Sequence, residues 1–145
     1  MDDVSVFFYG LFMDEALLAS KDVHPTRSAI GYVDGFRLHI GERASLLPEA
    51  GSRAYGVLMD VARPDLAKLY SDAGVADYEP EPVTVYLPGD VTAEAVCYNL
   101  PASKLTGTNP EYAAALLELS GRLGFPAPYV DHIERMLLGC EATDS

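Results

Sequence analysis

The order of apolar and polar residues predicts strands along most of this chain. The run from Val4 to Tyr9 is almost entirely apolar and rich in β-branched and aromatic residues, which favours a buried strand ending before Gly10. Apolar and polar residues alternate from Phe36 onward, which is typical of a strand with one buried face. The predicted strands after the first one are Arg27 to Ile40, Ala44 to Pro48, Arg53 to Val61, Pro82 to Leu87 and Val91 to Leu100.

Turn and cap residues separate these strands and mark four helices. We predict a turn at Glu49 to Ser52 and a hairpin turn at Pro88 to Asp90. Acidic or proline-containing starts predict helices from Asp14 to before His24, from Arg63 to Gly74, from Asn109 to Leu123, and after Pro128. This order contains too few β-α-β units for a doubly wound sheet. We therefore predict an α+β fold, a small mixed β-barrel with flanking helices.

Length and composition indicate one domain covering residues 1–145. The chain is 49 % apolar and 22 % charged, which is ordinary for a globular protein. Its apolar runs are far shorter than the roughly 20 residues of a membrane helix, and the Asp2-Asp3 start lacks the basic region of a secretory signal. We expect no membrane partner and a cytoplasmic location.

Charge and metal-ligand spacing exclude further classes of function. The formal net charge of −12 should repel nucleic acid and anionic membrane surfaces. Cys97 and Cys140 lack metal-type spacing, and the three histidines are scattered over separate elements. We expect no metal site and no disulfide framework.

Two stretches are candidates for chemistry. The turn Tyr9-Gly10-Leu11-Phe12 lies between a strand and a helix, where backbone N–H groups can hold a carboxylate or an oxyanion, although glycine is also common in purely structural turns. An acidic cluster precedes the hairpin, and one of its carboxylates could act as a general base in an apolar cavity. In a chain this acidic, such a cluster is more often solvated surface; it comprises Asp72, Asp77, Glu79 and Glu81.

Taken together, several stretches resemble the γ-glutamylcyclotransferase-like family. The run Phe8 to Met13 is similar to the Tyr-Gly signature after the first strand of that family, and Gly56 lies in a stretch similar to its central strand. The matching segments follow in the same order as in the family: Leu66 to Val85 with Gly74 and Tyr78, Asn109 to Tyr112, and Leu123 to Tyr129.

This resemblance implies a small barrel with a cavity for a small molecule that carries a γ-glutamyl or amide group. In the family reaction the α-amine of the substrate attacks its own γ-carbonyl, which gives 5-oxoproline without cofactor or metal. The resemblance places six residues in substrate binding: Tyr9, Gly10, Leu11, Phe12, Tyr78 and Tyr112.

The chain departs from the family pattern at the catalytic position. Ala73 stands where the family has the glutamate that moves the proton, and alanine cannot replace it. Asp72 and Glu79 are the candidate substitutes. The alternatives are a non-catalytic ligand-binding or regulatory relative, and an amide hydrolase on the same scaffold. The proline and charge near Glu79 should blunt a sheet edge, so we expect a monomer or a weak homodimer.

Overall fold

The computed structural model describes residues 3–70 and 78–142 of the chain. Its five strands are β1 (Asp3–Phe8), β2 (Arg27–Ile40), β3 (Ala44–Ala62), β4 (Glu79–Leu87) and β5 (Val91–Asn99). Its helices are α1 (Glu15–Ser20), α2 (Arg63–Leu69), α3 (Pro110–Leu123) and α4 (Ala127–Ala142), with short 3-10 turns η1 (Leu11–Met13) and η2 (Ala102–Lys104).

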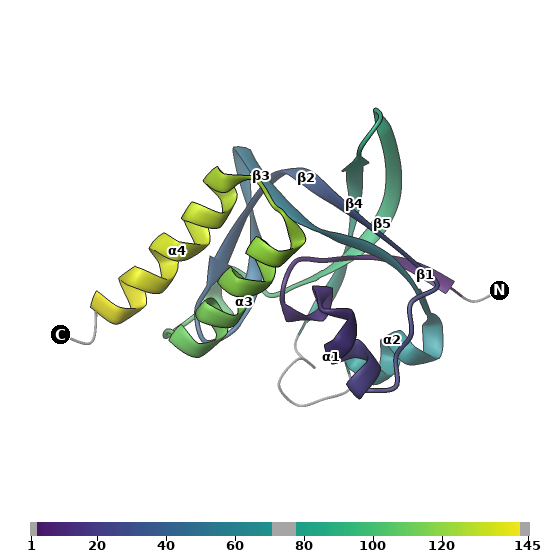
Figure 1. Cartoon of the computed structure of the whole chain (residues 1–145), viewed down its shortest axis with the longest axis horizontal. Coiled ribbons are helices and arrows are strands. Elements are labelled where there is room, and N and C mark those ends of the chain that lie inside the picture. Colours follow the sequence, from purple (N-terminus) through teal and green to yellow (C-terminus); the bar gives the residue numbers. More distant parts are fainter. Residues whose placement is uncertain (1–2, 71–77, 143–145) are drawn as a thin grey trace.

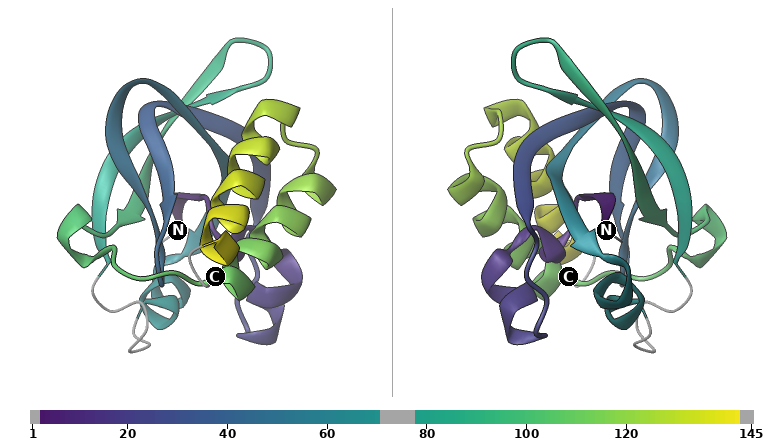
Figure 2. Two further views of the ribbon diagram at one scale, coloured as in Figure 1. Left: turned by 90° about the vertical axis from the view of Figure 1, so that its left-hand side faces the viewer. Right: turned by 90° about the vertical axis from the view of Figure 1, so that its right-hand side faces the viewer.

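The five strands close into a barrel in the order β1-β3-β2-β4-β5. Four of the strand pairs are antiparallel, and the closing pair, β1 with β5, is parallel through Val6 and Val96. Helices α3 and α4 pack along one side of the barrel, α1 and α2 lie at one end, and the β4–β5 hairpin tip projects at the other (Figures 1 and 2). The predicted α+β class, with a mixed sheet and flanking helices, is confirmed.

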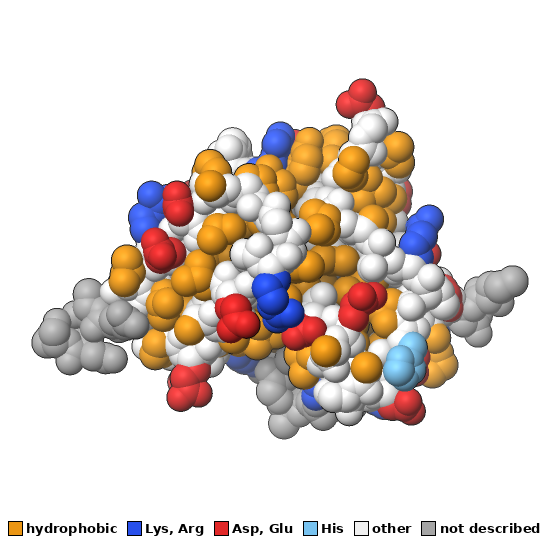
Figure 3. All heavy atoms as spheres, in the orientation of Figure 1, with side chains coloured by type: hydrophobic (Ala, Val, Ile, Leu, Met, Phe, Trp, Pro, Cys, Tyr) orange, Lys and Arg blue, Asp and Glu red, His pale blue; other side chains and the backbone are white. Residues whose placement is uncertain are grey.

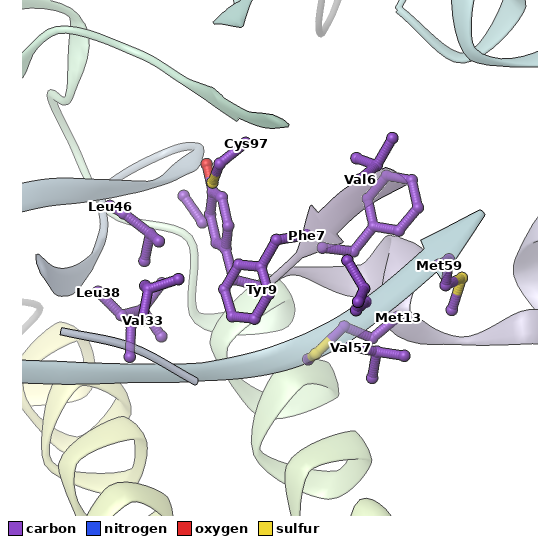
Figure 4. Close-up of a cluster of buried hydrophobic side chains, with 14 of the residues drawn as sticks. Val6, Phe7, Tyr9, Met13, Val33, Leu38, Leu46, Val57, Met59 and Cys97 are labelled. Carbon is purple, nitrogen blue, oxygen red and sulfur yellow. The ribbon is translucent and has the colours of Figure 1, made fainter. Parts of the chain in front are cut away.

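Large side chains that are almost fully buried fill the interior. Phe7 from β1, Leu38 from β2 and Leu46 from β3 are each exposed by 1 % or less. Figure 4 shows these side chains, with Tyr9 and Cys97 in the middle of the cluster. Among the residues that the model describes, no helix is long and apolar enough to cross a membrane.

The turn predicted at Glu49–Ser52 is wrong, because the two strands predicted on either side of it form the single strand β3. The register with β2 shows why, since Asp34 pairs with Arg53 and Phe36 with Pro48. One residue of β2 therefore faces four residues of β3, which form a bulge. Pairing with β2 on both sides of the bulge holds the chain extended in spite of its turn-like composition.

Two further boundaries differ from prediction. Helix α2 ends at Leu69, with Tyr70 as its cap residue, rather than at Gly74, which lies outside the described residues. Strand β4 begins at Glu79, ahead of its two prolines. Among the described residues, β4 pairs with β2 only at Tyr86. Pro80 and Pro82 therefore face no strand on this side of β4, and their lack of an N–H group costs no hydrogen bond there.

Gly56 provides a stability test of the packing between β1 and β3. A Cβ atom at this position would lie 2.3 Å from the carbonyl oxygen of Phe8 and 2.7 Å from the ring of Phe7. Because the first atom is backbone and the second belongs to a ring that is only 1 % exposed, we expect Gly56→Ala to lower the free energy of unfolding by about 3 kcal/mol in urea titrations.

Gly121→Ala is the matched control for this substitution. Gly121 lies in α3, and a Cβ atom there would meet nothing within 4 Å. Alanine should leave stability unchanged or raise it by up to about 1 kcal/mol, because alanine favours helix. Equal urea midpoints for Gly56→Ala and the unmodified protein would contradict the close packing.

Candidate ligand-binding site

A cavity of about 250 Å³ lies where β1 and β5 end and β4 begins. The parallel pairing of β1 with β5 brings the ends of these two strands to the same end of the barrel. Tyr9 follows β1, Tyr98 lies near the end of β5, and the hydroxyl of Tyr9 donates a hydrogen bond of 2.7 Å to the carbonyl oxygen of Tyr98. Both residues line the cavity.

The turn after β1 packs directly against α3. A Cβ atom on Gly10 would lie 2.3 Å from the hydroxyl oxygen of Tyr112, so only glycine fits without a shift. The N–H of Leu11 donates to the same hydroxyl over 3.3 Å. Asn109 caps α3 by accepting a hydrogen bond from the N–H of Tyr112, which fixes the start of the helix beside the turn.

The hydroxyl of Tyr112 remains able to donate a hydrogen bond to a ligand. Its oxygen accepts from Leu11, and no acceptor for its proton is recorded in the described part of the chain. In contrast, Tyr78 donates its proton to the carbonyl of Ala44, and Tyr9 donates to Tyr98. Tyr112 therefore offers a donor to the cavity, while Tyr9 and Tyr78 offer only lone pairs.

Burial keeps these phenols neutral. It raises the pKa of Tyr9 and of Tyr112 well above the ordinary value for tyrosine, and it raises the pKa of Tyr78 to about 12. A neutral phenol at physiological pH can donate or accept a hydrogen bond but is a poor general base. The described hydroxyls of the cavity are thus suited to binding.

Stacked aromatic rings form the rest of the cavity wall. The rings of Tyr70 and Tyr98 lie parallel with their centroids 4.0 Å apart, and Phe12 meets Tyr70 edge to face at 5.8 Å. Phe8 in turn meets Phe12 edge to face. Such an apolar wall strengthens the hydrogen bonds made beside it, because it lowers the local polarity.

The six predicted substrate-binding residues all line this one cavity: Tyr9, Gly10, Leu11, Phe12, Tyr78 and Tyr112. Sequence reasoning missed Tyr70 and Tyr98. Tyr70 directly follows the last residue of α2. Tyr98 is distant in the sequence and reaches this end of the barrel through the parallel pairing of β1 with β5. The family-like order of segments could have drawn attention to Tyr70, but no local pattern marks Tyr98.

The carboxylates do not converge on the cavity. Glu79 is exposed on β4 and is not among the lining residues, while Asp72 and Ala73 lie outside the described residues. Glu81 is half-buried and accepts a hydrogen bond of 2.8 Å from the side-chain amide of Asn99. Glu42, which is exposed, supplies the one carboxylate among the described residues that line the cavity.

A second cluster of polar side chains lies at the same end of the barrel. Asn99 and Ser45 are buried, and their side chains bond to the backbone of Leu46 and Leu100 respectively. The thiol of Cys97 contacts Asn99, and burial raises the pKa of this thiol. In the described part of the chain, no group of three or more His, Cys, Asp or Glu side chains is placed to hold a metal ion.

The contact between Gly10 and Tyr112 can be tested with a double-mutant cycle. We expect Gly10→Ala to cost about 1–3 kcal/mol of unfolding free energy, because its Cβ atom meets the tyrosine hydroxyl. Tyr112→Phe alone should cost about 1 kcal/mol through the lost hydrogen bond. The double variant should be more stable than the sum predicts, by about 0.5 kcal/mol or more, because the clashing atom is gone. Additive losses in urea titrations would contradict the contact.

The sequence of this chain also matches the model of a known protein family. The family model described as gamma-glutamyl cyclotransferase, AIG2-like, matches residues 6–115, which is more than half of the chain. No curated protein sequence matches the chain.

Solved structures share the fold. A gamma-glutamyl cyclotransferase is 16 % identical, with 91 % of this chain and 86 % of that chain covered and a TM-score of 0.72. An uncharacterised protein from Homo sapiens is 16 % identical, with 92 % and 88 % covered and a TM-score of 0.76. YkqA from Bacillus subtilis is 18 % identical, with 94 % of this chain but 55 % of that chain covered and a TM-score of 0.77. The chain therefore belongs to the gamma-glutamyl cyclotransferase, AIG2-like family.

Proposed function

We propose that this protein binds a small molecule with a γ-glutamyl or amide group in the cavity beside the Tyr9–Phe12 turn. The observation that carries the proposal is the hydroxyl of Tyr112, a donor held beside the N–H of Leu11 in a cavity otherwise lined largely by aromatic rings. Family membership supports the same class of ligand.

The chemistry of an amide group fits these donors. An amide carbonyl oxygen can accept the proton of Tyr112, and it can also compete for the N–H of Leu11, whose present bond of 3.3 Å is long. The aromatic wall formed by Tyr70, Tyr98 and Phe12 suits the methylene chain of a glutamyl group. This arrangement matches the usual ligand pocket, which is mostly apolar with a few placed polar groups.

Cyclisation of the bound ligand to 5-oxoproline is the second candidate function. In that reaction the α-amine forms a C–N bond to the γ-carbonyl carbon, and the leaving amine takes up the proton that the attacking amine loses. A carboxylate must carry that proton. Asp72 stands two positions after Tyr70, which lines the cavity, whereas Glu79 is exposed. The described residues favour binding over proton transfer, and amide hydrolysis on the same scaffold remains a further alternative.

We also propose a cytoplasmic protein that is a monomer or weak homodimer and binds no nucleic acid. The free, buried thiol of Cys97 suits a reducing compartment. The negative net charge disfavours nucleic acid, and the prolines near Glu79 disfavour pairing of that sheet edge with a second copy.

Tyr112→Phe tests ligand binding. The ring is kept and the donor is lost, so we expect the affinity for 5-oxoproline and for γ-glutamyl amides to fall by about tenfold in isothermal titration calorimetry. Tyr129→Phe is the matched control, because Tyr129 is also buried and its hydroxyl bonds to the carbonyl of Tyr55, outside the cavity. Equal losses in both variants would contradict a specific role for Tyr112.

Ala73→Glu tests the catalytic departure from the family. If the position matches the catalytic glutamate of the family, this variant should release 5-oxoproline from γ-glutamyl amines about 10²-fold faster than the unmodified protein. Ala73→Gln has nearly the same size but cannot move a proton, so it should leave the rate unchanged. Equal rates for the glutamate and glutamine variants would contradict the assignment of this position.

A further inference from the structure

We infer that Arg43, at the cavity, recognises a carboxylate of the ligand, so that this site selects anionic γ-glutamyl compounds over neutral amides. The inference rests on the proposed function and deepens it. Of the described residues that line the cavity, Arg43 is the one basic side chain, and it is half-buried.

The loop that carries Arg43 is held firmly against the segment before α3. The N–H of Glu42 donates 2.9 Å to the carbonyl of Thr106, and the side chain of Asn109 donates 3.1 Å to the carbonyl of Glu42. Gly41 approaches this segment so closely that a Cβ atom would lie 2.8 Å from the oxygen of Thr106. These contacts fix the backbone on which Arg43 stands, and Asn109 also caps the helix that presents Tyr112.

The charge of Arg43 acts at the hydroxyl of Tyr78. Burial raises the pKa of Tyr78 to about 12, and the positive charge of Arg43 opposes that rise. The guanidinium therefore stabilises negative charge at a point inside the cavity wall. Arg43 and Tyr78 line the same cavity, so a ligand carboxylate that binds beside them would be stabilised by the same charge.

The negative net charge of the chain makes the positive charge of Arg43 important for an anionic ligand. With 22 acidic and 10 basic residues, the protein repels anions at long range, so an anionic ligand needs a local positive charge. On the face that carries α1 and α3, basic side chains lie beside acidic ones, which lowers their pull on an anion (Figure 3). A guanidinium has five N–H donors and can hold a carboxylate while it keeps other interactions.

The two ends of a γ-glutamyl compound fit the two kinds of group in the cavity. The α-carboxylate would bind Arg43, and the amide end would meet the neutral donors of Leu11 and Tyr112. The product, 5-oxoproline, keeps this carboxylate and a ring amide. 5-Oxoprolinamide has the same ring but no negative charge, so the two compounds isolate the contribution of the carboxylate.

The test compares these two compounds by calorimetry with the unmodified protein and three variants. We expect the unmodified protein to bind 5-oxoproline at least about tenfold more tightly than 5-oxoprolinamide. Arg43→Gln should abolish this preference with little effect on the amide, and Arg43→Lys should keep part of it. Arg27→Gln is the control for the loss of one charge, because Arg27 pairs with Asp60 and is not among the cavity residues.

Each outcome bears on one of the two proposals. Equal affinities of the two compounds for the unmodified protein would overturn the role of Arg43 and leave the proposed function standing. A preference that survives in Arg43→Gln, or that Arg27→Gln loses to the same degree, would also overturn it. Absence of binding by both compounds would overturn the proposed function and the inference together.

Discussion

Five strands that close into a ring cannot all run antiparallel to both neighbours, so one seam must be parallel. In this barrel the parallel seam joins β1 to β5. The ends of these two strands therefore point the same way, and Tyr9 and Tyr98 meet beyond them. The aromatic wall of the cavity therefore depends on the parallel pairing of β1 with β5.

A mismatch in strand length provides the space for the cavity. In the ring, β1 lies between β3 and β5, but it has 6 residues and β3 has 19. Phe8 at the end of β1 pairs with Val57, so the first half of β3 extends beyond β1. There the side chains of Ser45 and Asn99 bond across to the opposite backbone in place of a strand ladder. These side-chain hydrogen bonds link the strands where β1 is absent, and among the described residues no further strand fills the space.

The sequence predicted the elements whose signals are local. Strand β2 has the predicted bounds, and α3 has the predicted cap residue at Asn109 and the predicted stop at Gly124. The continuity of β3 was not predictable, because residues 49–52 have the composition of a turn, and only the residues on either side of this bulge pair with β2. The Tyr9–Phe12 turn has a local signal in the sequence and lies at the cavity, whereas the position of Tyr98 beside it depends on the parallel seam, which leaves no periodic pattern in the sequence.

The chemistry of the cavity follows from what burial does to its side chains. Burial raises the pKa of Tyr9, Tyr70 and Tyr112, so these groups stay neutral and hold their protons in fixed hydrogen bonds or offer them to a ligand. Proton transfer at neutral pH needs a group that gains and loses its proton readily, and a deeply buried phenol does neither. A wall of such phenols beside one arginine can discriminate ligands by shape and charge. Reaction at this site would require a carboxylate in addition to these phenols, because none of them can carry the proton.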